Sequence, residues 1–339
     1  MMLEPALTND WLSFEQFKIR YINAAVEESP NNVMETVQEP LISIVIVTYQ
    51  HAKYIANAIE GVLMQKTDFP LEIILGDDDS TDGTREICIE YAARFPDKIR
   101  LFLHRRENNI KVLNRSTGIF QIAFNLYQCR GKYIALTSGD DYWQDDSKLQ
   151  RQVDYLEKDQ SASFTYHDCF ELFESTGRIK GPFTKKSIQS IVGRNIFPKL
   201  PREFLKIMQE DTFLKFFWNH VGNGVHLPTI DPVVIRFHCG NMFRSLENQA
   251  ELEQKMNLLR NLRLVCEQDR RLSDRVERKL AMRTVMKVIS ADAVPAYKKP
   301  FAILTELRKE RILYKGFLVA MEIIIKNARR LFPQRAGIA

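Results

Sequence analysis

Short apolar segments separated by helical patterns are the feature that most restricts the fold of this chain. Residues 41–48 (LISIVIVT) form a continuous, β-branched run, as in a strand buried on both faces. Similar runs follow at residues 71–76, 99–104 and 132–138, and a helical pattern precedes each of them. This alternation predicts an α/β fold, with a Rossmann-like mixed, mostly parallel sheet that is flanked by helices and wound by right-handed crossovers.

The patterns divide the chain into three regions. Residues 1–38 are expected to form an N-terminal helix capped by Asp10, followed by a polar linker. Residues 39–245 hold the α/β pattern. Residues 246–339 are highly charged and helical in pattern, which predicts a helical C-terminal extension.

Beyond residue 141 the α/β pattern becomes looser. Residues 162–173 alternate like an antiparallel strand, residues 209–220 have a helical apolar face, and residues 226–238 are predicted to form one or two strands. No internal repeat or low-complexity tract interrupts the chain.

Composition places the protein among ordinary globular chains. Its 339 residues are 45% hydrophobic and 27% charged, which excludes a disordered or collagen-like protein. The five cysteines are scattered without a CxxC pair, so neither a zinc knuckle nor a disulfide framework is indicated. The N-terminal residues carry acidic side chains and no uninterrupted apolar stretch, which argues against a secretory signal. We therefore expect a cytoplasmic protein.

The positive charge gathers near the end of the chain. Residues 296–339 hold ten Lys or Arg against three Glu, a local charge of +7, so the remainder is near −2 when the net charge is +5. From Arg308 to about Phe332 an apolar stripe faces a basic one, which predicts a closing amphipathic helix within residues 301–332. It could lie on the inner face of the plasma membrane or pack on protein, including a second subunit, and both alternatives stay open.

Two acidic clusters follow the apolar runs of the predicted sheet. Asp77, Asp78 and Asp79 come after residues 71–76, and Asp140 and Asp141 come after residues 132–138. A parallel sheet delivers the carboxyl ends of its strands to one crevice. Because clustered carboxylates repel each other unless a cation or hydrogen-bond donors are present, the pattern suggests a divalent metal and a phosphate-bearing ligand.

Three motifs in order resemble the family 2 glycosyltransferases of the GT-A fold. They are PLISIVIVTYQHAKYIANAIEGVLMQ, LEIILGDDDSTDGT and GKYIALTSGDDYWQDDSKLQRQVDYLE, and the resemblance covers about residues 40–240. It implies that residues 39–245 form a GT-A catalytic domain. It also implies transfer of a sugar from a nucleotide donor, commonly a UDP sugar, to an acceptor hydroxyl with inversion at the anomeric carbon.

The resemblance assigns donor-binding roles to the first two motifs. Val47, Thr48 and Tyr49 would line the nucleobase pocket, and Asp78 would hydrogen-bond the base. A carboxylate can accept a base N–H in a charge-assisted bond, which makes the assignment chemically reasonable. Asp77 and Asp79 are weaker candidates, because turn carboxylates often only cap the next helix.

The third motif, SGDDYW, matches the metal motif of the family. The resemblance places Asp140 near the ribose and Asp141 on a Mn²⁺ or Mg²⁺ ion. Such an ion binds oxygen ligands, bridges to substrate phosphates and neutralises the charge that builds on the departing diphosphate. Many relatives carry an acidic residue where this chain has Ser138, so a clamp of two carboxylates is not available here.

The base that inverting transfer requires is expected in the second half of the domain. Glu210 and Asp211 occupy the place that the family gives to it, and we favour Asp211, although Asp211 could also only cap the following helix. Arg236 and His238 lie two apart on a predicted strand, so both point to one face and could bind the diphosphate or a closing loop.

Other polar residues carry weaker signals. Lys111 and Asn114, before the metal motif, are donor-contact candidates without a specific signature. The remaining histidines show no metal-ligand spacing; they are His51, His104, His167, His220 and His226.

Two other functions are less consistent with the sequence than glycosyl transfer. A nucleotidyltransferase would need a Gly-rich basic loop after the first strand, whereas residues 48–54 (TYQHAKY) offer one Lys and no Gly. A non-catalytic binder of nucleotide sugars or glycans would not need the retained carboxylates. The expected partners are a nucleotide-sugar donor and a glycan or lipid-linked acceptor, whereas nucleic acid is a poor partner for an acidic crevice.

Overall fold

A computed structural model describes residues 10–239, 248–267, 269–289, 299–313, 315–316 and 319. The chain separates into two compact units, one holding Asp10–Arg244 and the other Ser245–Ala339.

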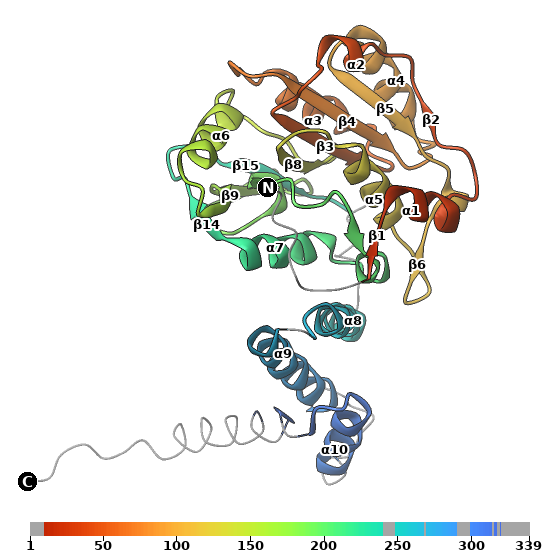
Figure 1. Ribbon diagram of the computed structural model, residues 1–339, viewed down its shortest axis with the longest axis vertical. Helices are drawn as coiled ribbons and strands as arrows, with labels where there is room; N and C mark the ends of the chain where they lie inside the picture. The colour runs from red at the N-terminus through yellow and green to blue at the C-terminus, as the bar shows by residue number, and fades with distance from the viewer. Residues whose placement is uncertain are drawn as a thin grey trace, which may run out of the picture. The chain divides into compact units, whose positions relative to one another are not determined.

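The first unit is built on an eight-stranded mixed sheet (Figure 1). Its central strands are all parallel, in the order β8, β3, β4, β5. The antiparallel strands β12 and β2 flank them. The whole order is β14 (Asn223–His226), β9 (Ala162–Tyr166), β12 (Val192–Arg194), β8 (Tyr133–Ser138), β3 (Ile42–Thr48), β4 (Leu71–Asp77), β5 (Ile99–Leu103) and β2 (Glu27–Glu28). The predicted α/β fold with a mostly parallel sheet is confirmed.

Helices cover both faces of this sheet. On one face lie α3 (Ile55–Leu63), α4 (Thr84–Arg94) and α6 (Lys148–Lys158). They enclose the main core with strand residues that include Ile44, Ile73 and Leu101. On the other lie α5 (Ile119–Gln128) and α7 (Glu210–Val221). Gly193 of β12 allows α7 to approach closely, because an added Cβ would lie 2.3 Å from the ring of Trp218.

A smaller sheet stands beside the large one and supplies part of the candidate site. Its order is β11 (Arg178–Phe183), β10 (Cys169–Phe173), β15 (Val233–Phe237), with β10 and β15 parallel. The expected single strand over residues 162–173 is therefore wrong: the chain leaves the large sheet after Tyr166 and enters the small one at Cys169. A bridge from Tyr142 to Val234 joins β15 to the loop after β8.

The N-terminal segment packs on the first unit. Helix α1 (Phe14–Tyr21) is capped by Ser13, in a reciprocal capping box with Gln16, rather than by Asp10. Strand β1 (Trp11–Leu12) pairs with β13 (Leu200–Pro201).

The segment expected to be a linker instead becomes part of the sheet edge. It contains β2 and the short helix α2 (Val33–Thr36). Glu28 binds the Arg100 guanidinium at 2.8 Å, and this ion pair with a largely buried arginine ties the strand in place. The remaining short elements are η1 (Arg106–Asn108), β6 (Lys111–Val112), β7 (Arg115–Ser116), η2 (Ile188–Ser190) and η3 (Arg202–Lys206).

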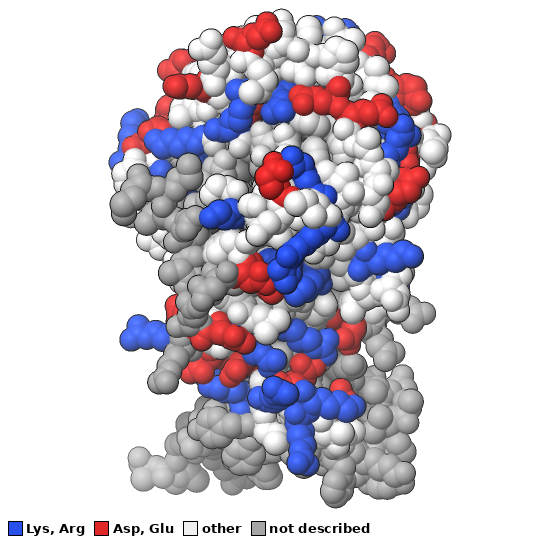
Figure 2. Space-filling model, turned by 45° about the vertical axis from the view of Figure 1, so that its right-hand side comes forward, with Lys and Arg blue, Asp and Glu red and all other residues white. Residues whose placement is uncertain are grey.

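The second unit is helical, as the charge pattern predicted. It contains α8 (Asn248–Val265), α9 (Arg270–Ile289) and α10 (Lys299–Lys309), and Arg260 of α8 binds Glu310 just after α10. The described part contains no helix with the length and apolarity that a membrane span requires. Figure 2 shows Lys and Arg side chains lying among Asp and Glu over the residues coloured there.

The closing helix differs from the prediction within the described residues. Helix α10 ends at Lys309, and Arg311 adopts a left-handed backbone with φ 56°, so the chain turns there instead of continuing as one helix from Arg308. Ile312 is buried after the turn. Residues 320–339, which carry most of the predicted amphipathic pattern, lie outside the described residues.

Candidate functional site

The two acidic clusters meet at the carboxyl edge of the large sheet. Strand β3 lies between β4 and β8, with Thr48 opposite Asp77 and Val47 opposite Ser138. The backbone N–H of Asp78 donates to the Thr48 carbonyl at 3.0 Å. Asp78 and Asp140 therefore lie on either side of the end of β3, about 10 Å apart at two strand spacings.

Asp78 is a buried carboxylate, and one of its two oxygens has no hydrogen-bond partner. Its Oδ2 accepts from Arg106 at 3.0 Å and from Asn109 at 2.9 Å, whereas its buried Oδ1 has no hydrogen-bond partner. Burial raises the pKa of Asp78 to about 6, although both donors oppose the shift. The Arg106 guanidinium lies 4.1 Å from the ring centre of Tyr49, which is 40% exposed. The Tyr49 ring and the Arg106 guanidinium therefore lie beside a buried hydrogen-bond acceptor.

The other two residues of the first candidate strand end are less accessible. Val47 is half-buried and Thr48 is buried. The Thr48 hydroxyl lies against Gly139, where an added Cβ would be 2.6 Å from it, so this glycine lets the two loops approach. Tyr49 is thus the member of this trio that exposes its side chain.

Asp77 and Asp79 help to hold the loop. Asp77 is fully buried and accepts from the Ser80 backbone N–H at 3.1 Å and from Arg85 at 3.2 Å. Asp79 has a left-handed φ of 63° and accepts from the backbone of Arg106. These hydrogen bonds of Asp77 and Asp79 fix the loop that carries Asp78.

Asp140 is surrounded by two histidines. The Asp140 carboxylate accepts from the Ser138 hydroxyl, and its Oδ2 lies 3.1 Å from Nε2 of His238 and 3.8 Å from Nε2 of His51. One ligand atom from each of the three residues lies within 4.8 Å of the others. Burial lowers the pKa of His51, while the Asp140 charge opposes the shift. This set of one carboxylate and two imidazoles fits a divalent transition-metal ion.

The loop after β3 holds His51 through its backbone. Gln50 adopts a left-handed φ of 57°, and its side chain makes two hydrogen bonds to Thr81. The His51 N–H donates to the Thr84 hydroxyl at 2.8 Å, and the Ala52 N–H donates to Asp82. The STDGT segment therefore connects the β3 loop to the start of α4.

Asp141 points elsewhere. Its Oδ1 accepts from the backbone N–H of Arg236 at 2.8 Å, and burial, together with the Asp140 charge, raises the pKa of Asp141 well above its usual value. The histidine group contains Asp140 and not Asp141. The assignment of the metal to Asp141 stays a prediction, and the geometry favours Asp140 for that role.

Arg236 and His238 leave β15 toward different partners. The Arg236 guanidinium lies over the rings of Tyr54 and Tyr142 and donates to Asn57 of α3 at 3.3 Å. His238 reaches Asp140 and packs on the Tyr54 ring at 4.7 Å. The small sheet thus delivers His238 to the site, and Arg236 lies beside it.

Asp211 lies on the first turn of α7. It accepts from Lys215 at 2.7 Å and from Thr212, and its side chain is 36% exposed. Lys215 also donates to the Lys186 carbonyl, close to η2, which packs on β8 and β15. Burial and the Asp211 charge raise the pKa of the neighbouring Glu210 to about 7. No contact among the described residues joins Asp211 directly to Asp78 or Asp140.

Sequence reasoning missed three residues of the site. His51, Arg106 and Asn109 carry no local signature, and His51 was set aside for lack of metal-ligand spacing. Only His51 could have been predicted from the topology. It follows β3, the strand between those that carry the two acidic clusters, and so lies at the same edge of the sheet. Lys111 and Asn114, proposed as donor contacts, are exposed on the β6–β7 hairpin.

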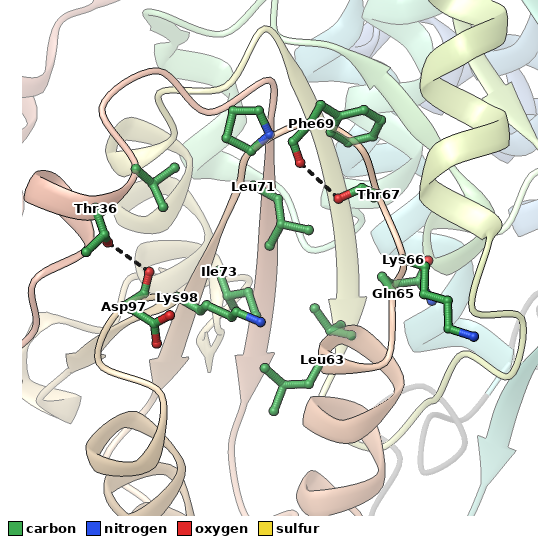
Figure 3. Close-up of a pocket in the computed structure, with 13 residues that line it drawn as sticks. Thr36, Leu63, Gln65, Lys66, Thr67, Phe69, Leu71, Ile73, Asp97 and Lys98 are labelled. Carbon is green, nitrogen blue, oxygen red and sulfur yellow. Dashed lines mark hydrogen bonds between the residues drawn. The ribbon is translucent and has the colours of Figure 1, made fainter.

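A separate depression lies at the opposite edge of the sheet (Figure 3). It has a volume of about 500 Å³ and is lined by Leu63, Leu71, Ile73 and polar residues that include Thr36 and Lys98. Leu71 begins β4 and Asp77 ends it, so the depression is about 20 Å from the acidic edge. The Thr36 hydroxyl donates to the Asp97 carbonyl and the Thr67 hydroxyl to that of Phe69. This depression is not part of the candidate site.

The chain is similar to known proteins over the part that forms this site. Residues 43–203 match the family model described as glycosyl transferase family 2. An uncharacterized protein of Mycobacterium tuberculosis is 40% identical over 133 residues, which are 39% of this chain and 36% of that protein. The putative teichuronic acid biosynthesis glycosyltransferase TuaG of Bacillus subtilis is 31% identical over 128 residues, 38% of this chain and 46% of TuaG.

These curated relatives are matched over less than half of their length. Among solved structures, residues 1–349 of S. aureus TarS in complex with UDP-GlcNAc align with a TM-score of 0.53 at 16% identity, covering 79% of this chain and 80% of that one. This likeness supports the predicted GT-A fold. Residues 43–203 of this chain therefore form a glycosyl transferase family 2 domain.

Proposed function

We propose that the protein transfers a sugar from a nucleotide donor, a UDP sugar in the first instance, to an acceptor hydroxyl with inversion at the anomeric carbon. The observation that carries the proposal is the placement of Asp78 and the Asp140 group on either side of the end of β3. Asp78 offers a hydrogen-bond acceptor for a base next to the Tyr49 ring. Asp140 and its two neighbouring histidines offer ligands for a cation. The distance between Asp78 and Asp140 suits a nucleoside diphosphate that lies across the strand end.

Donor recognition is assigned to the residues after β3 and β4. Tyr49 would stack on the base, and the unpartnered Oδ1 of Asp78 would accept a base N–H. Arg106 and Asn109 hold Asp78 in place through its other oxygen, so the free oxygen keeps its direction. Half-buried Val47 and buried Thr48 would form the wall of the nucleobase pocket.

The diphosphate would lie against Asp140 and His238. A divalent cation bound by these residues would neutralise the charge of the departing nucleoside diphosphate. Ser138 donates to Asp140 and so orients its carboxylate. Arg236 contributes positive charge beside His238, and its backbone N–H fixes Asp141.

Acceptor activation is assigned to Asp211. A carboxylate at the start of α7 can take the acceptor proton as the anomeric carbon is attacked from the face opposite the diphosphate. Lys215 holds the Asp211 side chain at 2.7 Å. Glu210, with its pKa raised to about 7, is the competing candidate in the same turn.

We further propose a role in bacterial surface polysaccharide or lipid-linked glycan assembly. The name of TuaG, a putative teichuronic acid biosynthesis glycosyltransferase of Bacillus subtilis, supports this range of acceptors. Contact with the inner face of the plasma membrane through residues 301–332 belongs to the same proposal. A binding protein without turnover and a nucleotidyltransferase have no specific observation in their favour.

Release of nucleoside diphosphate from a panel of nucleotide sugars, with Mn²⁺ present, tests the proposal. We expect turnover with at least one donor, and loss of turnover in Asp140→Asn. The anomeric configuration of the product, read by NMR, should be opposite to that of the donor. Tight binding of every accepted donor without any release would contradict the proposal.

A further inference from the structure

His51 is largely buried, and its two ring nitrogens have different surroundings. Its side chain is 16% exposed, and its buried Nδ1 makes no hydrogen bond, whereas its Nε2 faces the Asp140 carboxylate. The contact with Asp140 at 3.8 Å is too long to count as one. The backbone contacts of His51 and Ala52 instead hold the imidazole next to Asp140. An imidazole nitrogen held beside a carboxylate, but beyond hydrogen-bond distance, is placed as two ligands of one ion would be.

We propose that His51 is a protein ligand of the cation, together with Asp140 and His238, and that this nitrogen-rich site selects Mn²⁺ or a similar transition-metal ion over Mg²⁺. The inference rests on the proposed function, because it concerns the cation of the same site.

The spacing of the three residues agrees with one shared ion. Ligand atoms about 2.1 Å from an ion lie about 3 Å apart at adjacent corners and about 4 Å apart at opposite ones. Nε2 of His238 and of His51 lie 3.1 and 3.8 Å from Oδ2 of Asp140, and all three ligand atoms are within 4.8 Å. Small side-chain adjustments would bring them around one centre.

The chemistry of the donors determines the preference. Mg²⁺ binds oxygen ligands in near-ideal octahedra and keeps several waters, whereas imidazole suits later first-row ions. Two of the three donors here are imidazoles, and the position that could have supplied a second carboxylate is Ser138, which donates to Asp140 instead. The protein therefore offers one anionic oxygen and two neutral nitrogens.

Three segments that are distant in sequence assemble this set. His51 follows β3, Asp140 follows β8 and His238 follows β15. The rings of His51 and His238 are perpendicular, with centroids 6.1 Å apart, and so do not stack on each other. One ligand atom from each of them and from Asp140 lies within 4.8 Å of the others.

Mn²⁺ binding to the purified full chain, with and without UDP, tests the inference by electron paramagnetic resonance. We expect His51→Gln to weaken Mn²⁺ binding about tenfold or more, and to remove one of two imidazole nitrogen couplings from the bound ion. His220→Gln is the matched control, because His220 lies in the last turn of α7, away from this group, and should change neither reading. His51→Asp exchanges nitrogen for oxygen and should move the preference toward Mg²⁺.

The outcomes separate the inference from the proposed function. Unchanged Mn²⁺ affinity and nitrogen coupling in a folded His51→Gln variant would overturn the inference, as would a wild-type preference for Mg²⁺. Normal Mn²⁺ binding in a chain that turns over no nucleotide sugar would count against the proposed function and leave the metal assignment intact.

Discussion

Replacing Asp78 by Asn should change how the stability of the protein depends on pH. The folded-state pKa of Asp78 is about 6, raised by burial from 3.8. Between these values the folded protein holds a proton that the unfolded chain releases, so the group costs stability as pH rises. The cost is absent below about pH 4 and complete above about pH 6. A shift of roughly two units corresponds to about 3 kcal/mol in the free energy of unfolding.

Asn at this position carries no titrating proton, so the variant should escape that pH dependence. The difference in free energy of unfolding, variant minus wild type, is expected to rise by about 3 kcal/mol in favour of Asn between pH 4 and pH 7. Other titrating groups cancel in the difference. Because Asp78 is 3% exposed, little of the effect should be lost to solvent screening.

Urea denaturation at constant ionic strength, repeated across this pH range, measures the difference. Arg106→Ala provides a second comparison. The Arg106 charge opposes the shift, so its loss should move the pKa of Asp78 further upward. A constant difference between wild type and Asp78→Asn across the range would refute the reasoning. It would mean that the Asp78 carboxylate is as well solvated in the fold as in the unfolded chain.

Three further predictions concern chemistry, donor binding and packing. Asp211→Asn should lower kcat about 100-fold to 10,000-fold in a donor-release assay, and Glu210→Gln should lower it less. A larger loss in Glu210→Gln than in Asp211→Asn would identify Glu210 as the base. Tyr49→Ala should weaken UDP binding about threefold to tenfold in calorimetry, whereas Tyr49→Phe should leave it unchanged. Equal UDP affinities of the wild type and the Ala variant would exclude stacking of the base on this ring. Gly193→Ala should destabilise the fold by about 1–3 kcal/mol in chemical denaturation, because the new Cβ would lie 2.3 Å from the Trp218 ring, whereas Gly118→Ala meets no atom within 4 Å and is the control.

The large sheet could be predicted because its strands carry their own signal. The runs at β3, β4, β5 and β8 are apolar on both faces, as strands between two helical layers must be. The edges could not be read in the same way. Strand β2 is two exposed glutamates, Glu27 and Glu28, and it joins the sheet through its backbone and through the ion pair with Arg100. Such an edge depends on its neighbour and leaves no pattern of its own.

The second sheet was missed for a related reason. Residues 162–173 alternate without interruption, but His167 and Asp168 carry the chain from one sheet to another. Period-two alternation says that a segment is extended and half-buried, and it does not say which sheet it joins. Placement of β10 beside β15 is a long-range pairing, and this pairing is what brings His238 to Asp140.

The same distinction separates the acidic residues of the site from its histidines. Asp78 and Asp140 each follow an apolar strand directly, so the topology of a parallel sheet is sufficient to predict that they share an edge. His51 instead depends on a left-handed Gln50 and on hydrogen bonds from the loop after β4, which carries Thr81 and Thr84. Those contacts involve residue types that are common in any turn, so their purpose appears only when the two loops are side by side. The STDGT segment, which by itself indicates only the start of a helix, is what fixes the direction of a metal-ligand candidate.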